Sequence, residues 1–344
     1  MRLLIVTQKV DPADPILGFF IRWIKALAKQ CDEVLVIGQF MGVHSLPENV
    51  RVFSLGKEKG VARWRQILHF WALQWKLRKQ YDRVFVHMTP IWIVLGSPLW
   101  LLMRKPMYLW YEVRRGGSVL KLGLLCVRRV FSATSHGLPA ASKKQLVVGH
   151  GIDVDFFTPS PEEREEGLIV TVGRITKVKH LDVIVSEFAQ LSSSCNLVIA
   201  GVPITLEDQE EAQKLKKSIE ELGISDRVRI GPISHDHVCS LLQRASLVLH
   251  AGSGGLDKII LEAMACGCPV VASSHAAQDV LPEQCVCEND AMADCAQRIL
   301  ELPAQERSQL SEDLRRRVVE GHSLKKLVER LVTEMTSEAV ESGK

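Results

Sequence analysis

Short runs of apolar, largely β-branched residues recur along the chain, separated by stretches with apolar residues every three or four positions. The runs predict buried strands, and the stretches between them predict helices. In the first half the predicted strands are RLLIVT (2–7), EVLVIG (33–38), VRVFSL (50–55), RVFVHM (83–88), MYLWYE (107–112) and QLVVG (145–149). The predicted helices cover 17–30, 61–80 and 118–130.

The same alternation begins again after residue 167. The predicted strands there are LIVTVG (168–173), NLVIAG (196–201), RVRIG (227–231), LVLHA (247–251) and PVVAS (269–273), and the helices cover 179–191, 206–222, 237–244 and 257–266. Strands that alternate with helices form parallel sheets covered on both faces. Two such series predict an α/β fold of two doubly wound, Rossmann-like domains that face a cleft, residues 1–152 and 168–322.

Between the two series, DVDFFTPSPEEREEG (153–167) has two prolines and a run of acidic residues, which predicts a linker. A last helix, from 323 to about 340, follows the second domain and has the position to pack back on the first. The segment Val84–Met103 contains no fully charged residue and is long enough to span a membrane. Its two prolines and His87 favour a buried strand, a turn and a buried helix instead.

Charge divides the chain into two unlike halves. Residues 1–150 hold 23 Lys and Arg against 8 Asp and Glu, whereas the remainder holds 20 against 32. The basic half is expected to meet something anionic. No DNA- or RNA-binding motif accompanies this charge, so nucleic acid is not the predicted partner.

One predicted helix of the basic half offers a specific partner. Over 61–80, Trp64, Leu68, Trp71 and Trp75 fall on one face, with Arg63, Arg65, Lys76, Arg78 and Lys79 around or beyond it. Tryptophan flanked by cations is typical of a helix at an anionic membrane surface. An ordinary helix that covers the sheet with its Trp face fits the same pattern, and both interpretations stay open.

Nine cysteines occur without a CxxC or a disulfide framework, which indicates a reducing compartment and inert thiols rather than a metal site. Arg2 leads directly into a strand, and no signal peptide is expected. The expected location is cytoplasmic, with peripheral attachment at the inner face of the membrane if the Trp-rich helix binds lipid.

Two glycine-containing loops carry the candidate chemistry. In VGRITKVKH, Gly173, Arg174 and Lys179 follow a predicted strand, and two cations at a strand end suit a diphosphate. A solvated basic loop is the alternative interpretation.

In HAGSGGLDKIILEAMACGCPVVAS (250–273), Gly252, Gly254 and Gly255 precede a helix whose N-terminus favours negative charge. Glu262 lies one to two turns inside that helix, where its oxygens suit the hydroxyls of a sugar or ribose. A glycine-rich turn followed by a surface glutamate remains the alternative interpretation.

Together these segments resemble glycosyltransferase family 4. LEAMACGCPVVAS (261–273) is similar to the segment near the donor sugar, VGRITKVKHLDVIV (172–185) to the GR-x4-K stretch, and GHGIDVDFF (149–157) to the G-[IV]-D-x3-F hinge strand. NLVIAGVP (196–203) and DRVRIGPIS (226–234) match in order and spacing. The resemblance covers roughly residues 145–275.

The resemblance implies a GT-B fold and the transfer of a hexose-type sugar from a nucleotide-sugar to a glycan or lipid-linked acceptor. It also implies retention at the anomeric carbon, no metal or other cofactor, and a place in polysaccharide or cell-envelope glycan synthesis. Arg174 and Lys179 would be catalytic, because they bind the diphosphate and offset charge on the leaving group. The implied donor-binding residues are Gly18, Gly173, Arg174, Lys179, Gly231, Ile233, Ser253, Gly254, Gly255, Asp257, Lys258 and Glu262.

The chain departs from the family pattern at two places. The first glutamate of E-x7-E falls on Gly254, with Asp257 as the nearest acid, and WYEVRRGG (110–117) has no histidine where family members often carry one. A catalytically silent relative that binds a nucleotide-sugar and supports a partner transferase is therefore the second hypothesis. No GxGxxG follows a strand, which disfavours a dinucleotide enzyme.

Overall fold

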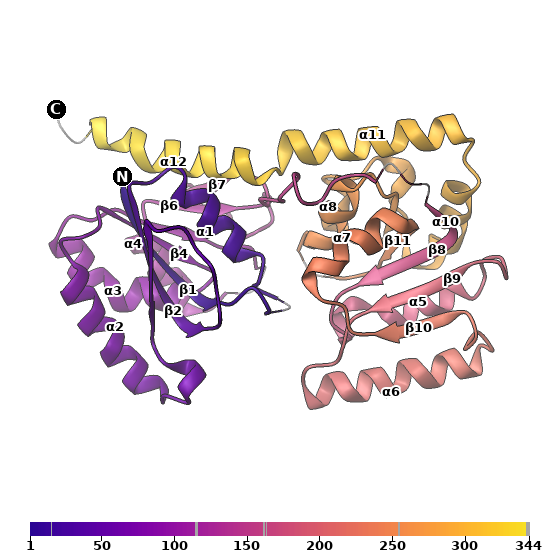
Figure 1. The fold of residues 1–344 in the computed structure, drawn as a ribbon, viewed down its shortest axis with the longest axis horizontal. Helices are drawn as coiled ribbons and strands as arrows, with labels where there is room; N and C mark the ends of the chain where they lie inside the picture. Colours follow the sequence, from indigo (N-terminus) through magenta and orange to yellow (C-terminus); the bar gives the residue numbers. More distant parts are fainter. Residues whose placement is uncertain (15, 114–115, 161, 163, 254, 342–344) are drawn as a thin grey trace. The chain divides into compact units, whose positions relative to one another are not determined.

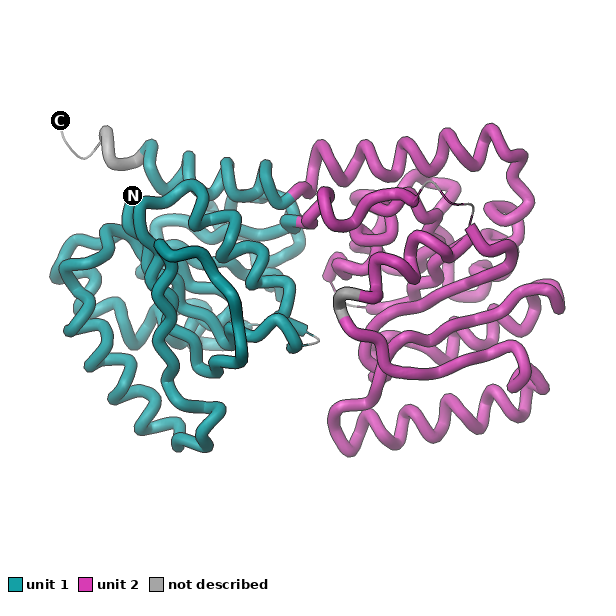
Figure 2. The backbone as a smooth tube through the Cα atoms, in the orientation of Figure 1, with its two compact units in different colours: residues 1–151, 324–344 teal, residues 152–323 magenta. Residues whose placement is uncertain are grey.

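The structure of the chain is a computed structural model that describes residues 1–14, 16–113, 116–160, 162, 164–253 and 255–341. It divides into two compact units, residues 1–151 with 324–344 and residues 152–323 (Figure 2). Each unit contains one parallel sheet with α-helices around it (Figure 1). The predicted α/β class with two doubly wound sheets is confirmed.

Unit 1 contains a seven-stranded parallel sheet in the order β3-β2-β1-β4-β5-β6-β7. The pattern of apolar runs located all of its strands except β6. The strands are β1 (Arg2–Val10), β2 (Glu33–Met41), β3 (Val50–Ser54), β4 (Arg83–His87), β5 (Met107–Trp110), β6 (Arg129–Ser132) and β7 (Gln145–Val147).

The predicted helix over 118–130 is too long. Helix α4 (Ser118–Cys126) ends because Val127 adopts an extended conformation, and β6 begins two residues later. β6 lies between β5 and β7, and Val130 and Phe131 are fully buried there. The backbone pairing on both sides of β6 outweighs the helical spacing of this apolar segment.

The two faces of the unit 1 sheet bury different helices. Leu3 and Ile5 of β1 pack with α1 (Phe20–Ala28) and α12 (Leu324–Glu341), which lies beside α1 in Figure 1. Leu4 and Val6 face the other way, toward a core formed with α2 (Arg63–Leu77), α3 (Pro90–Leu102) and α4. The last helix of the chain therefore completes the core of the first unit.

The apolar segment Val84–Met103 forms β4, a turn and α3, as its prolines predicted. Pro90 is the first residue of α3, where the missing N–H is tolerated. Among the described residues, no helix is both long and apolar enough to cross a membrane.

Unit 2 contains a five-stranded parallel sheet in the order β10-β9-β8-β11-β12. Its strands are β8 (Glu165–Val172), β9 (Asn196–Ala200), β10 (Val228–Gly231), β11 (Ala245–His250) and β12 (Val270–Ala272). Its helices are α5 (Leu181–Phe188), α6 (Leu206–Glu221), α7 (His235–Arg244), α8 (Lys258–Ala265), α9 (His275–Gln278), α10 (Met292–Leu300) and α11 (Ala304–Gly321). The sequence pattern did not locate α9, α10 or α11.

The predicted linker 153–167 ends earlier than expected. Residues 165–167 belong to β8, because Glu165 pairs with Ala245 of β11. The Glu165 carboxylate also accepts a hydrogen bond of 2.6 Å from Arg244 Nε. Glu165 can therefore begin β8, because Arg244 lies beside it and pairs with its carboxylate.

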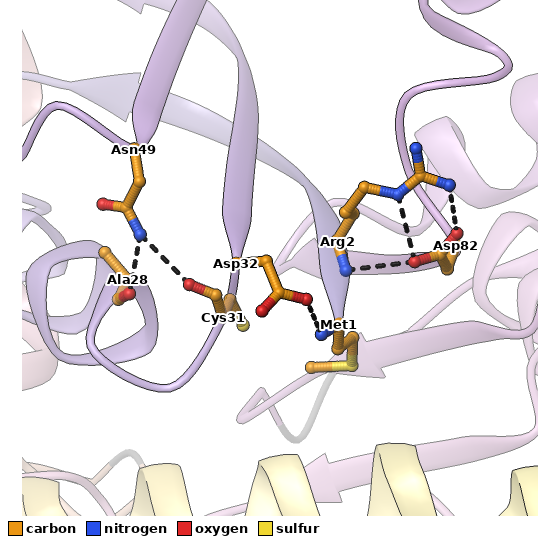
Figure 3. Close-up of polar contacts among 7 residues, drawn as sticks. All are labelled: Met1, Arg2, Ala28, Cys31, Asp32, Asn49 and Asp82. Carbon is orange, nitrogen blue, oxygen red and sulfur yellow. Dashed lines mark hydrogen bonds and ion pairs between the residues drawn. The ribbon is translucent and has the colours of Figure 1, made fainter.

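Hydrogen bonds connect the start of β1 and the end of α1 to neighbouring loops (Figure 3). The Arg2 guanidinium and backbone N–H both donate to the Asp82 carboxylate, with 2.7 Å between Nη2 and Oδ1. The Asn49 amide donates to the carbonyl oxygens of Ala28 at 2.8 Å and Cys31 at 3.1 Å. These bonds connect the start of β1 to the residue before β4, and the end of α1 and its following turn to the residue before β3.

Asp82 makes a testable contribution to stability. The hydrogen bond from Arg2 holds the pKa of Asp82 below its ordinary value. A depressed folded pKa stabilises the fold above the unfolded pKa of about 4, and this stabilisation disappears as the pH falls through the folded pKa. We expect Asp82→Asn to be less stable than the wild type at pH 7 by less than about 1 kcal/mol, since the pair is partly exposed. In thermal unfolding the difference should shrink below about pH 4; a difference that is constant from pH 7 to 3 would contradict this origin.

Candidate functional site

The topology of unit 2 creates a crevice at one point of its sheet. β8 and β11 are neighbouring parallel strands, but the chain continues from β8 to β9 on one side and from β11 to β12 on the other. The loops that follow them therefore diverge, and such a switch point is where doubly wound sheets bind ligands. Both predicted glycine-containing loops start there, at residues 173 and 251.

Three side chains meet at the crevice: Lys179 and Asp257 from the two loops, and His250 from the end of β11. The Lys179 ammonium contacts the Asp257 carboxylate directly. His250, the last residue of β11, places Nε2 3.2 Å from Oδ2 of the same carboxylate. Asp257 is the residue before α8, but its carboxylate turns to these two partners, and the described residues show no side-chain cap on α8.

Asp257 is an anion in this arrangement. Burial by itself would raise the pKa of Asp257, but the Lys179 charge and the hydrogen bond with His250 outweigh it. Together they hold the pKa of Asp257 well below its ordinary range. The site therefore carries a fixed negative charge between two basic side chains.

Glycines make room for these side chains. Gly173 has a φ of 147°, and a Cβ there would come within 3.2 Å of Lys179 Nζ. A Cβ on Gly252 would lie 2.9 Å from the His250 ring, and one on Gly201 would lie 1.8 Å from the Gly173 carbonyl oxygen. Only a residue without a side chain lets the loop after β8 approach the loop after β9 so closely.

A depression opens at the same point. Its lining contains the polar side chains of Thr171, Arg174, Lys179 and His250, and apolar residues of β8, β9, α5 and the loop after β11. A hydrogen bond of 3.1 Å from the Ser253 backbone N–H to the Val178 carbonyl joins the two loops that form the rim. The predicted pair Arg174 and Lys179 is thus brought together with a histidine that the sequence analysis did not nominate.

Glu262 is not the surface glutamate of the alternative interpretation. Its exposed fraction is 7%, and α8 is buried along almost its whole length. A carboxylate in such a helix is held by polar contacts rather than by solvent. Glu262 is therefore a buried residue of α8.

The remaining predicted residues lie at different places. Gly231 ends β10 and accepts a hydrogen bond of 2.7 Å from the Gly201 N–H, and Ile233 packs against the core in the loop that follows. Gly18 belongs to unit 1, where a Cβ would come within 2.6 Å of two backbone carbonyl oxygens. Lys258 is the first residue of α8 and Gly255 precedes it by three positions, whereas Gly254 lies outside the described residues.

His250 is the residue that sequence reasoning missed. Asp257, one of the donor-binding residues that the resemblance implies, contacts Lys179 and His250. A signal for His250 existed, because it is a polar residue at the carboxyl end of an otherwise apolar strand, directly before a glycine turn.

In the described part of unit 2, the cysteines and acids do not form a metal centre. Among the described residues, no group of three or more His, Cys, Asp or Glu side chains has the arrangement of a metal site. Cys266 and Cys268 are fully buried, and burial raises the pKa of Cys268 to about 11. These thiols are packing residues.

Comparison with known proteins identifies relatives of unit 2 by sequence and of the whole fold by structure. Residues 155–317 match the family model described as "Glycosyl transferases group 1". The D-inositol 3-phosphate glycosyltransferase of Mycolicibacterium smegmatis is 31% identical over 146 residues, which are 39% of this chain and 33% of that protein. The Frankia alni protein of the same name is 32% identical over 148 residues. The chain spans about a third of the length of these curated relatives.

Solved structures show the same fold over nearly the whole chain. Anabaena HepE, solved in complex with UDP-glucose, has a TM-score of 0.78 at 17% identity and covers 98% of this chain and 100% of that one. Sucrose-phosphate synthase from Thermosynechococcus elongatus has a TM-score of 0.76 at 18% identity, with coverage of 99% and 100%. The fold is that of the GT-B glycosyltransferases, and the family match lies on the unit that contains the crevice.

Proposed function

We propose that this chain is a glycosyltransferase that takes a sugar from a nucleotide-sugar whose diphosphate binds at the crevice of unit 2. The observation that carries the proposal is the convergence of Arg174 and Lys179 on one depression at the switch point of the sheet. Two cations and the N-terminus of α8 are groups that suit a diphosphate, and one of the cations, Lys179, is paired with Asp257. The family match over residues 155–317 supports the same assignment.

In this proposal the two cations perform the main catalytic work. As the bond between the sugar and the diphosphate breaks, negative charge develops on the leaving phosphate oxygen. Arg174 and Lys179 offset that charge, and preorganised charges of this kind lower the barrier substantially. Glu262 would hold the ribose hydroxyls, and the loop with Gly231 and Ile233 would contact the base.

We further propose that a hexose-type sugar passes with retention, and without a metal, to a glycan or lipid-linked acceptor in envelope glycan synthesis. These points rest on the resemblance to glycosyltransferase family 4 and on the two fixed cations, which supply the charge that a metal provides elsewhere. The loss of the first E-x7-E glutamate at Gly254 supports the second candidate, a silent relative that binds a nucleotide-sugar for a partner enzyme.

A ligand screen tests the proposal directly. Thermal unfolding is measured with UDP, GDP and ADP and with their hexose conjugates, because a ligand that binds only the folded state raises the apparent Tm. Stabilisation by a diphosphate and its sugar conjugate is expected, whereas no shift with any of them would contradict the proposal. Release of the nucleoside diphosphate from the bound conjugate would distinguish the enzyme from the silent relative.

The exposed face of α2 is relevant to the proposed lipid-linked acceptor, because it carries apolar side chains. Trp64, Leu68, Trp71 and Trp75 are all about half exposed or more, while Phe70 and Leu77 face the core. The interpretation that the Trp face covers the sheet is therefore wrong. Helices α3 and α4 follow as direct neighbours and expose further leucines, which are Leu101, Leu102, Leu122 and Leu125.

We propose that this α2–α4 surface attaches the protein peripherally to anionic membranes. Cations lie next to the apolar residues, with Arg65 over the Trp64 ring and Arg78 over the Trp75 ring. Apolar area enters the headgroup region while the cations meet acidic lipids. A lipid-linked acceptor would be found at the same surface.

Liposome co-sedimentation tests the attachment. Trp64→Ala/Trp75→Ala and a Lys76, Arg78 and Lys79 to Gln variant should each reduce binding to anionic vesicles by at least about tenfold. A tenfold change corresponds to about 1.4 kcal/mol, and each lost cation or tryptophan contributes roughly 1 kcal/mol or more. Trp71 is left in place because its Nε1 donates to the Leu95 carbonyl of α3.

The matched control replaces the exposed Lys214, Lys216 and Lys217 of α6 by Gln, which should leave binding unchanged. Equal sedimentation of the wild type with neutral and anionic vesicles would contradict the electrostatic part of the proposal.

A further inference from the structure

Lys179, the cation proposed to bind the donor diphosphate, already contacts a carboxylate of its own unit. The Asp257 carboxylate lies against the Lys179 ammonium, and the side chains are 28% and 22% exposed. A phosphate that takes Lys179 must therefore compete with Asp257. The crevice is less positive than Arg174 and Lys179 alone would make it.

Asp257 has a second partner that does not depend on Lys179. His250 Nε2 is 3.2 Å from Asp257 Oδ2, and the His250 side chain is almost fully buried. Gly252 leaves room beside the ring, and Nδ1 has no hydrogen-bond partner among the described residues, so Nε2 is the ring nitrogen with a polar partner. With Nε2 protonated, the histidine donates to the carboxylate whether Lys179 is present or not.

We propose that Asp257 is an internal counter-ion that competes with the donor diphosphate for Lys179, and that His250 keeps the Asp257 carboxylate hydrogen-bonded when Lys179 turns to the phosphate. The inference rests on the proposed function and assigns new roles to two of its residues. Asp257 and His250 are positioning residues, since they act through Lys179.

Competition between Asp257 and the diphosphate for Lys179 affects which ligand leaves the site more readily. A carboxylate beside the phosphate site repels a free nucleoside diphosphate, which carries more negative charge than the sugar conjugate. Asp257 therefore favours release of the product over release of the donor. Its carboxylate also returns to Lys179 when the product leaves, so the ammonium is never buried without a partner.

Calorimetric titration with inorganic pyrophosphate in metal-free buffer tests the counter-ion. Asp257→Asn should bind pyrophosphate more tightly, on the order of tenfold. The substitution removes repulsion between the carboxylate and the phosphate, and in a partly exposed site such repulsion changes the dissociation constant by about this factor. Asn is as good a residue as Asp before a helix, and Asp257→Ser serves as a second variant that also preserves the helix start.

A gain in affinity is a result that loss of structure does not produce. In a Lys179→Ala background, Asp257→Asn should lose most of its effect, because the competition requires the lysine. The control is Asp182→Asn, an exposed acid in the first turn of α5, which should change pyrophosphate affinity less than twofold. Weaker binding by both Asp257→Asn and Asp257→Ser would overturn the proposal. Asp257 would then hold Lys179 in position for the phosphate instead of competing for it.

His250 is tested by a pair of variants of similar volume. His250→Leu removes the donor and leaves Asp257 dependent on Lys179, so pyrophosphate should bind several-fold more weakly. His250→Gln retains an amide donor near the position of Nε2 and should restore much of the affinity. Equal affinities of the two variants would overturn the role of His250.

The outcomes separate this inference from the proposed function. Wild-type protein that binds neither pyrophosphate nor any nucleoside diphosphate would overturn both. A different result would overturn only the counter-ion role of Asp257. In that case the wild type binds pyrophosphate and needs Arg174 to do so, but neither Asp257→Asn nor Asp257→Ser binds it more tightly, and the proposed function stands.

Discussion

Arg174→Ala and Lys179→Ala are each expected to weaken binding of a nucleoside diphosphate about 10- to 150-fold without unfolding the protein. Each variant removes a charge-assisted hydrogen bond, and such bonds contribute about 1.5–3 kcal/mol. Both side chains line the depression at the ends of β8 and β11, and neither belongs to the buried core. Turnover should fall at least as much as affinity, because the charge on the leaving phosphate is greatest in the transition state.

Calorimetric titration with the nucleoside diphosphate that stabilises the wild type measures the loss. Lys177→Ala is the matched control, since Lys177 belongs to the same 3₁₀ turn as Lys179 (Lys177–Lys179) and is exposed. The control should bind like the wild type. Unchanged affinity in both Arg174→Ala and Lys179→Ala would remove these residues from the site.

Gly201→Ala is expected to destabilise unit 2 by about 3 kcal/mol, the upper part of the range for overpacking. The new methyl group would lie 1.8 Å from the Gly173 carbonyl oxygen, which is a backbone atom that cannot rotate away. The loop after β8 must therefore shift, and Arg174 follows it. Thermal unfolding should show a Tm lower by ~6–12 °C, together with weaker binding of the nucleoside diphosphate.

The same substitution at Gly321 separates this clash from a general effect of adding a methyl group. A Cβ there meets nothing within 4 Å in the described part of the chain, at the end of α11. Gly321→Ala should be neutral or slightly stabilising, because alanine favours a helix. A Gly201→Ala protein with the Tm of the wild type would show that the loops after β8 and β9 do not approach as closely as this.

The strands of both sheets could be located from the sequence because a buried parallel strand needs an unbroken apolar run, and that requirement is local. RLLIVT and NLVIAG fall within or overlap β1 and β9 for this reason. β6 was missed because its apolar residues directly follow α4 and were included in the helix predicted over 118–130, whereas pairing with β5 and β7 decides their conformation. Helices α10 and α11 follow the last strand, where no alternating pattern marks them.

The Trp face of α2 shows the limit of a helical pattern. The spacing of Trp64, Leu68, Trp71 and Trp75 correctly placed them on one side of the helix, but periodicity does not say which side meets the sheet. In the structure the opposite side, with Phe70 and Leu77, is buried. Packing against the sheet and α3 decides this, so the membrane proposal depends on the tertiary structure.

By itself, the sequence determined the two α/β series, the positions of most strands and the pair of cations after β8. These follow from residue type and spacing within short segments. Only the tertiary structure brought His250 and Asp257 to Lys179, and it buried Glu262, for which the sequence had left a surface position open. Residues 179 and 257 are 78 positions apart, and they meet because parallel pairing of β8 with β11 brings both strand ends to one edge. Their contact is a property of the sheet order, which no local pattern encodes.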